Sequence, residues 1–285
     1  MRAAVLGAPI AHSLSPHLHK AAYRAMGLGG WSYEAFECDD TQLPWMLDKL
    51  RPVRGGDNPD GKTAWAGLSL TMPLKRAVLP LLDTVSDLAV EVGGANTVIF
   101  DGGARHGENT DVYGVERALA EAGVTAPRSA LVLGGGATAA SILAALRNLG
   151  ASAAALVVRD TGRAGETVAV AERLGVALSV ATFDKIDALL DVDLVVSSLP
   201  SGAADVFASR LVRVPALFDV VYSPWPTRAA TAVQAAGGKV VGGFSMLLHQ
   251  AVRQVELMTG RSDVPVEAMR AAGEAEILRR ATQTD

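Results

Sequence analysis

The feature that most constrains the fold is a run of apolar residues that leads directly into a glycine turn. Residues 131–133 read Leu-Val-Leu, and a run of small residues follows them: Gly134, Gly135, Gly136, Ala137, Thr138 and Ala139. This spacing is G-x-G-x-x-A, in which the first glycine permits a tight turn, the second admits backbone amides to a pyrophosphate, and the alanine lets a helix pack closely on a sheet. The helix start adds N–H donors and partial positive charge. The run therefore predicts a dinucleotide site, although glycine-rich turns also occur without a ligand.

Apolar strands alternate with helices around and beyond this turn. We expect strands at 155–158, 194–197 and 217–220, and helices at 139–149 and 164–174. Strands that are apolar throughout are typical of a parallel sheet covered by helices on both faces. The pattern predicts a Rossmann-like, doubly wound dinucleotide-binding domain.

The end of the second expected strand bears on the choice of cofactor. Residues 155–158 run into Arg159, where an NAD-binding strand would end in an isolated acidic residue that holds the ribose. Arg159 and Arg163 can grip a 2′-phosphate through charge-assisted hydrogen bonds, which favours NADP. Two solvated surface arginines are the alternative. Asp160 lies between them and keeps NAD open, because it can bond an unphosphorylated ribose.

The first hundred residues also read as α/β structure. Apolar runs predict strands at 3–7, 31–37, 66–70 and 97–100, the last turning at Asp101-Gly102-Gly103 into a returning strand at 104–107. Helical spacing predicts helices at 16–26, with Ser15 as N-cap, and at 42–50, 74–82 and 111–122. Residues 51–63 are dense in Gly, Pro, Asn and Asp, which is typical of a surface loop.

The order of these elements predicts two domains. We expect an N-terminal α/β substrate domain at 1–105 and a nucleotide-binding domain at 106–242. Residues 246–258 are strongly helical but offer too little partner surface of their own. We therefore expect the C-terminal helices of 243–285 to complete the first domain.

Composition excludes several classes of protein. The 285 residues are 49% hydrophobic and 20% charged, and the net charge of -4 is spread along the chain without a basic block for nucleic acid. No segment approaches the roughly 20 apolar residues of a membrane span, so we expect a cytoplasmic protein. The single Cys38 and five scattered histidines indicate neither a disulfide nor a metal site.

Several short clusters, taken in order, carry a family resemblance. They are GAPIAHSLSP at 7–16, GLSLTMPLK at 67–75, GANT at 94–97, GENTD at 107–111, DVVYSP at 219–224 with Thr227, and Gly243 followed by MLLHQ at 246–250. Together, before and after a nucleotide-binding unit, they resemble the shikimate dehydrogenase family over nearly the whole chain. The resemblance implies reversible, NADPH-dependent reduction of 3-dehydroshikimate to shikimate in aromatic amino acid biosynthesis.

Lys75 and Asp111 are the candidate catalytic pair. Reduction of a ketone by hydride leaves an oxyanion that must receive a proton, and a fixed cation stabilises the charge as it forms. Lys75 suits both tasks, and a carboxylate at Asp111 can orient it and accept a bond from a substrate hydroxyl. Whether Lys75 gives the proton or mainly stabilises charge stays open. The resemblance implies the same two residues.

The resemblance also implies the remaining site residues. Ser13 and Ser15 correspond to ligands of the substrate carboxylate, and other polar residues correspond to partners of the ring hydroxyls or the carboxylate: Ser69, Thr71, Asn96, Tyr222 and Gln250. Gly243 joins the cofactor-binding group with the glycine turn. Each polar residue alone is more typical of a cap or a turn, and only the combination favours a binding role.

Three departures from the family pattern keep alternatives open. The family commonly has Asn-Val-Thr where this chain has Ser69-Leu70-Thr71, His-Asn where it has His19-Lys20, and Asn-Arg-Thr where it has Val158-Arg159-Asp160. These leave room for an NAD-dependent relative that acts on quinate or an aminoshikimate. A dinucleotide sensor without catalysis is a further alternative. The sequence is compatible with a monomer or a homodimer.

Overall fold

A computed structural model of the chain describes residues 1–50 and 64–283. The loop predicted at 51–63 lies outside the described residues. The chain forms two compact units, the first made of 1–110 with 251–285 and the second of 111–250. Of the described helices, none is long and apolar enough to cross a membrane.

The first unit is built on a mixed six-stranded sheet in the order β2-β1-β3-β5-β6-β4. Its strands are β1 (Arg2–Gly7), β2 (Ser32–Glu37), β3 (Trp65–Leu70), β4 (Thr84–Val85), β5 (Thr97–Asp101) and β6 (Ala104–Glu108). β1 pairs in parallel with β2 and β3, whereas β5 is antiparallel to both β3 and β6. The sequence-based boundary near residue 105 falls inside β6, which belongs to this sheet because it pairs with β5.

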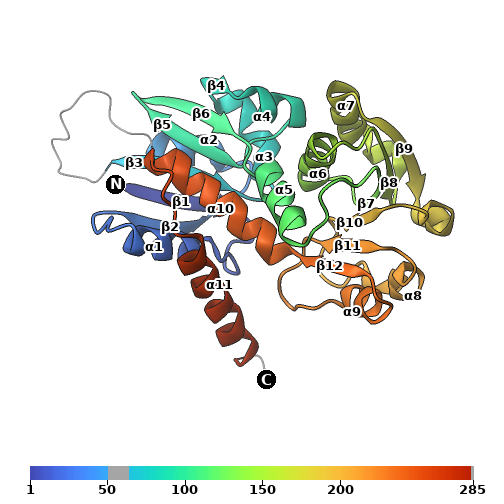
Figure 1. Ribbon diagram of the computed structural model, residues 1–285. Helices are drawn as coiled ribbons and strands as arrows, with labels where there is room; N and C mark the ends of the chain where they lie inside the picture. The colour runs from blue at the N-terminus through green and yellow to red at the C-terminus, as the bar shows by residue number, and fades with distance from the viewer. Residues whose placement is uncertain (51–63, 284–285) are drawn as a thin grey trace. The chain divides into compact units, whose positions relative to one another are not determined.

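Helices cover both faces of this sheet. One face packs against α2 (Leu43–Lys49), α3 (Leu74–Ala77) and α4 (Asp87–Val92), through a core that includes Leu6, Leu47, Leu68, Leu74 and Val98. The other face meets α1 (Ser15–Ala25) and the part of α10 (Gly243–Thr259) that follows residue 250: His19 stacks on Tyr33, and Gly67 lies against Met258. The last helix, α11 (Val266–Ala281), packs beside α1 (Figure 1).

Two local predictions in this unit had different outcomes. The helix predicted over 74–82 is wrong as one element, because α3 ends at Ala77 and a 3-10 turn, η1 (Leu79–Leu81), follows. Pro80 explains the break, since it has no backbone N–H to continue the helix. The hairpin at 97–107 is confirmed, and the positive φ angles fall on Gly102 (54°) and Gly103 (83°).

The second unit carries a six-stranded, fully parallel sheet in the order β12-β11-β10-β7-β8-β9. The strands are β7 (Ser129–Leu133), β8 (Ala153–Val158), β9 (Ala177–Thr182), β10 (Leu194–Ser197), β11 (Ala216–Asp219) and β12 (Lys239–Gly242). Counted from β7, this is the order 3-2-1-4-5-6 of doubly wound dinucleotide-binding sheets. The predicted fold class is confirmed.

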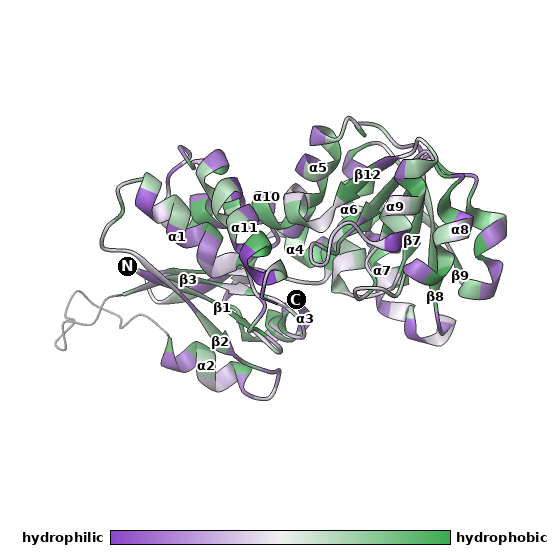
Figure 2. Ribbon diagram, turned by 90° about the horizontal axis from the view of Figure 1, so that it is seen from below, coloured by the Kyte–Doolittle hydropathy of each residue, from purple (hydrophilic) through white to green (hydrophobic). Residues whose placement is uncertain are grey.

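The helices of the second unit sandwich its sheet. They are α5 (Asp111–Glu121), α6 (Ala137–Asn148), α7 (Gly165–Leu174), α8 (Ala208–Leu211) and α9 (Arg228–Ala235), with 3-10 turns η2 (Thr161–Arg163), η3 (Phe183–Leu189) and η4 (Asp205–Phe207). η3, α8 and α9 share a core with one face of the sheet. The apolar strands are coloured green in Figure 2. Polar groups stand at the ends of these strands, and the candidate site residues of this unit occur there.

Candidate active site

The glycine turn lies at the carboxyl end of β7, where the strand order of the second sheet reverses between β7 and β10. Gly134 has φ +99°, and a Cβ placed there would lie 2.6 Å from Ser198 Oγ, so this position requires glycine. Gly136 precedes α6, and nothing lies within 4 Å of where its Cβ would be. Ala139 is fully buried, as close packing of α6 on the sheet requires. Backbone can therefore approach a pyrophosphate at this turn.

Thr167, from α7, holds the turn in place. Its hydroxyl donates to the Gly135 carbonyl at 2.8 Å, and the residue is fully buried. Thr167 was not predicted from the sequence, because a threonine on an expected helix carries no signal that it contacts a turn 32 residues earlier.

The turn after β8 presents Arg159 and Arg163 to solvent. In the described parts of the chain neither side chain makes a hydrogen bond or an ion pair. Asp160 lies between them, and its carboxylate accepts a bond from Gly162 N at 2.9 Å while its carbonyl accepts one from Arg163 N. Asp160 thus orders the turn that carries the two arginines, which gives it a structural task here.

The segment after β11 carries Tyr222, which is half-buried. The buried Asp219 anchors it by accepting bonds from Val221 N at 3.2 Å and Thr227 Oγ1 at 3.1 Å. Burial raises the pKa of Asp219 despite these bonds. Gly243 packs against the same segment, since a Cβ there would lie 1.8 Å from the Val220 carbonyl oxygen. Asp219 and Gly243 therefore fix the backbone that presents Tyr222.

In the first unit, Ser13 and Ser15 lie in the turn that leads into α1. Ser15 is the first residue of the helix and not its N-cap, which is Leu14, so the predicted cap role is wrong. Ser13 Oγ accepts a bond from Ser15 N at 3.3 Å. The Ser15 carbonyl in turn bonds to His19 Nδ1 at 2.9 Å. The two serines therefore share one hydrogen-bonded turn.

His19 should make folding sensitive to acid. It is fully buried and stacked on Tyr33, and burial lowers its pKa to about 4. The unfolded chain then binds the proton more readily, so His19's stabilising effect is complete above about pH 6.5 and is lost as pH falls towards 4. We expect wild-type protein to lose roughly 3 kcal/mol more unfolding free energy than His19→Asn between pH 7 and pH 4. Urea unfolding at both pH values measures this, and equal losses in the two proteins would contradict it.

Ser69 belongs to a buried hydrogen-bond network. Its hydroxyl accepts from Tyr33 OH and donates to Gln254 Oε1, both at 2.7 Å. Gln254 Nε2 donates in turn to Thr97 Oγ1 at 3.0 Å and to the Asn96 carbonyl at 3.2 Å. Because the proton of Ser69 goes to Gln254, any direct bond from Ser69 to a substrate must be one that Ser69 accepts.

Gln254 should be important for stability. Gln254→Leu leaves the buried Ser69 and Thr97 hydroxyls each without one partner, and unmet buried polar groups cost about 1–3 kcal/mol each. We expect the free energy of unfolding to fall by about 2–4 kcal/mol in urea titrations. The neighbouring Arg253→Ala removes only an ion pair with Glu256 and should cost less than about 1 kcal/mol. Equal losses in the two variants would contradict this assignment.

Lys75 lies beside the segment that carries Asn96. Its carbonyl accepts a bond from Ala95 N at 2.8 Å, and the Gly94 carbonyl accepts one from Asn109 Nδ2 at 2.9 Å. Asn96 is buried and bonds to Thr110 through both ends of its carboxamide, with Thr110 N at 2.8 Å from Asn96 Oδ1. These bonds bring the start of α3 and the 94–97 and 109–110 segments together within the first unit.

The remaining predicted residues are placed as follows. Asp111 is buried at the start of α5, directly after Thr110. Thr71 is half-buried just beyond β3. Gln250 is buried in α10, and its Nε2 donates to the Leu247 carbonyl at 2.9 Å. In residues 1–50 and 64–283 no three His, Cys, Asp or Glu side chains are arranged to hold a metal ion.

Two family models match the chain. The model described as the shikimate dehydrogenase substrate binding domain matches residues 5–98, and that of the shikimate 5'-dehydrogenase C-terminal domain matches residues 243–272. The matched segments hold Ser13, Lys75, Asn96 and Gln250.

Named relatives extend the similarity over nearly the whole chain. Shikimate dehydrogenase (NADP(+)) of Oleidesulfovibrio alaskensis is 34% identical over 278 residues, covering 94% of this chain and 92% of the relative. The crystal structure of Mycobacterium tuberculosis shikimate dehydrogenase is 41% identical, with a TM-score of 0.85 over 96% of this chain and 99% of that one. The Thermus thermophilus enzyme, solved in complex with NADP(H) and shikimate, is 32% identical, with a TM-score of 0.82 over 96% and 99% of the two chains. These matches agree with the glycine turn and the Lys75 segment, and they show that the chain belongs to the shikimate dehydrogenase family.

Proposed function

We propose that this protein is an NADP-dependent shikimate dehydrogenase, which reduces 3-dehydroshikimate to shikimate and catalyses the reverse oxidation. The observation that carries the proposal is its membership of this family over 94% of its length, with Lys75 and Asp111 at the positions that the family motifs predict. Fold alone does not give function, so the chemistry of these side chains matters. In this reaction one ring carbon of the substrate exchanges a hydride with the cofactor. The oxygen on that carbon exchanges a proton with the protein.

The second unit supports a role in binding NADP. Gly134, Gly135 and Gly136, with Ala137 and Thr138, would hold the pyrophosphate at the start of α6, and the exposed Arg159 and Arg163 would hold the 2′-phosphate. Gly243 would act through its close packing on the Val220 backbone. When bound, NADPH supplies the hydride. Asp160 Oδ1 accepts a bond from Gly162 N, and this role of the carboxylate in the turn supports NADP over NAD.

Lys75 and Asp111 would carry the proton chemistry. The Lys75 ammonium would stabilise the oxyanion that hydride addition creates, and it can also give the proton. The family resemblance implies that the Asp111 carboxylate would orient the lysine and accept a bond from a ring hydroxyl. Asp111 lies at the start of α5, and the partial positive charge of a helix N-terminus attracts a carboxylate at that position.

The other polar residues would bind the substrate. Ser13 and Ser15 are assigned to the carboxylate, and the other residues are assigned to the ring hydroxyls or the carboxylate: Thr71, Asn96, Tyr222 and Gln250. Ser69 would act as an acceptor or through the network with Gln254, because its own proton is already donated. Asn96 has a second task, since its bonds to Thr110 fix the backbone one residue before Asp111.

The direct test is oxidation of NADPH in the presence of 3-dehydroshikimate. We expect turnover that depends on both compounds and falls by about 10³-fold in Lys75→Ala. If well-folded protein bound NADPH in calorimetry but turned over no cyclic polyol acid, the result would contradict an enzymatic function. It would support the alternative of a dinucleotide sensor without catalysis. A cytoplasmic location and a monomer or homodimer stay predictions from the sequence.

A further inference from the structure

The C-terminal part of α11 carries a charged cluster that the proposed function does not use. Glu276 is buried, with 6% of its side chain exposed. It accepts bonds from Arg279 Nε and Nη2, both at 2.7 Å, and from Arg280 Nε at 2.6 Å. His17 Nε2 lies 3.5 Å from the same carboxylate. The bonds from the two arginines lower the pKa of Glu276 to about 2, so its charge persists throughout the working range of an enzyme.

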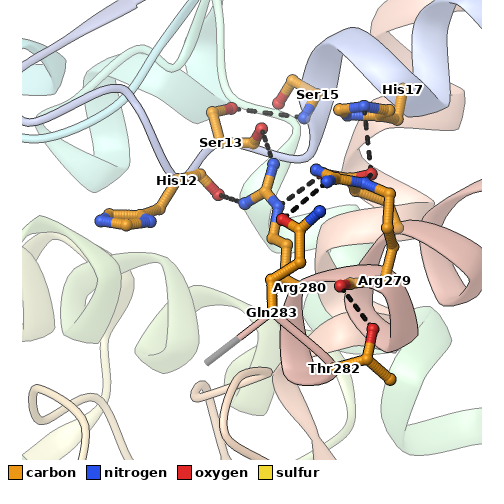
Figure 3. Close-up of polar contacts among 9 residues, drawn as sticks. His12, Ser13, Ser15, His17, Arg279, Arg280, Thr282 and Gln283 are labelled. Carbon is orange, nitrogen blue, oxygen red and sulfur yellow. Dashed lines mark hydrogen bonds and ion pairs between the residues drawn. The ribbon is translucent and has the colours of Figure 1, made fainter. Parts of the chain in front are cut away.

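Arg280 connects this cluster to the turn that contains Ser13. Its Nη1 donates to the His12 carbonyl at 2.7 Å and its Nη2 to the Ser13 carbonyl at 3.4 Å, while Nε remains on Glu276. Figure 3 shows the Arg280 guanidinium between α11 and the two successive carbonyls. One planar group thus joins a fixed anion to the backbone of a turn more than 260 residues earlier in the chain.

Arg279 differs from Arg280 in one respect that matters. It makes two bonds to Glu276 and donates to Gln283 Oε1 at 2.9 Å. Within the described residues no bond joins Arg279 to the turn, and its side chain is 54% exposed against 25% for Arg280. The two arginines share an ion-pair partner, but only Arg280 contacts the turn.

The contacts of Arg280 fall on the backbone that presents two proposed substrate ligands. Ser13 Oγ and Ser15 N are already joined, and the Ser15 carbonyl is held by His19. The bonds from Arg280 to the His12 and Ser13 carbonyls add further support to this turn. Ligands that are fixed before binding lose less entropy on binding, and small misplacements of such ligands are costly.

We propose that Arg280, oriented by Glu276, is a positioning residue that fixes the 12–15 turn and so sets the affinity for the substrate carboxylate. This inference rests on the proposed function, because that function assigns the carboxylate to Ser13 and Ser15. Arg280 acts through the turn and does not touch the substrate. Its loss therefore weakens substrate binding more than it slows the chemical step.

Steady-state kinetics with shikimate and NADP test the proposal on the full-length protein. Arg280→Met should raise the KM for shikimate about 10-fold, because misplaced ligands lose binding, and leave kcat and the KM for NADP within about two-fold. Arg280→Lys, which keeps the charge but lacks the planar fork, should give a smaller rise. Arg279→Met is the matched control, since it also removes one arginine from Glu276, and all its constants should stay within about two-fold of wild type.

The outcomes separate this inference from the proposed function. Thermal unfolding of both methionine variants shows whether any KM change follows from a loss of fold. If Arg280→Met is poorly folded, the change in the KM for shikimate in Arg280→Lys decides whether the inference holds. The inference would be overturned if the KM for shikimate in Arg280→Lys or in Arg280→Met equalled that of wild type. It would also be overturned if Arg279→Met raised this KM as much as Arg280→Met does. In either case the proposed function would stand, because wild-type activity is unaffected. Wild-type protein that does not oxidise shikimate would overturn the proposed function and this inference with it.

Discussion

Lys75→Ala should lower kcat for shikimate oxidation by about 10³-fold, the scale expected when a positioned acid or a fixed cation is lost. The KM for NADP should change little, because the proposed function assigns Lys75 to the substrate and assigns the glycine turn, Arg159 and Arg163 to the cofactor. Initial rates at saturating NADP measure the effect. Lys49→Ala is a matched control: this exposed lysine rests on the Trp45 ring and should leave kcat unchanged.

A double variant shows whether Lys75 and Asp111 act as a unit. Asp111→Asn alone should lower kcat by about 10²-fold or more, and the double variant should be hardly slower than Lys75→Ala, because groups that act together have non-additive effects. Effects that multiply would mean that the two residues act independently. A Lys75→Ala protein with normal kcat would remove lysine from the chemistry altogether.

Arg159 and Arg163 should determine the preference for NADP. Charge-assisted hydrogen bonds are worth about 1.5–3 kcal/mol each, so replacing both arginines by methionine should raise the KM for NADP about 100-fold. The KM for NAD, which has no 2′-phosphate, should change less than about three-fold. The catalytic constant kcat should be maintained at saturating NADP.

The control for this experiment is Arg213→Met. Arg213 is an exposed arginine of the same unit that pairs with Asp187, so its loss changes the net charge without affecting the turn after β8. It should leave both KM values unchanged. If the double variant lost affinity for NAD as much as for NADP, the two arginines would be supporting the turn rather than binding the phosphate.

Much of the fold follows from periodicity and turn chemistry. The apolar strands β7, β10 and β11 and the Gly102-Gly103 hairpin follow directly from local sequence, because these signals need no distant partner. Other elements were not predicted. β9 alternates exposed and half-buried residues at the edge of its sheet, and the two-residue β4 depends on pairing with β6. Strands like these are defined by their neighbours rather than by their own composition.

The residues of the candidate site also differ in whether the sequence alone predicts them. Lys75, Asp111 and the glycine turn stand in recognisable motifs, whereas Gln254 and Arg280 act across more than 150 residues of sequence. Gln254 is one helical turn beyond Gln250, a spacing that placed it on the same face of α10, but its partners Ser69 and Thr97 appear only in the fold. Arg280 stands among several charges of a helix end, which the sequence alone presents as a solvated surface.

The central claim is the identity of the reaction, and one comparison tests it most directly. The values of kcat/KM should be measured for wild-type protein with shikimate and quinate, each with NADP and with NAD. We expect the combination of shikimate and NADP to exceed each of the other three by at least about 10-fold, which corresponds to about 1.4 kcal/mol of transition-state discrimination. A higher kcat/KM with quinate or with NAD would contradict the account.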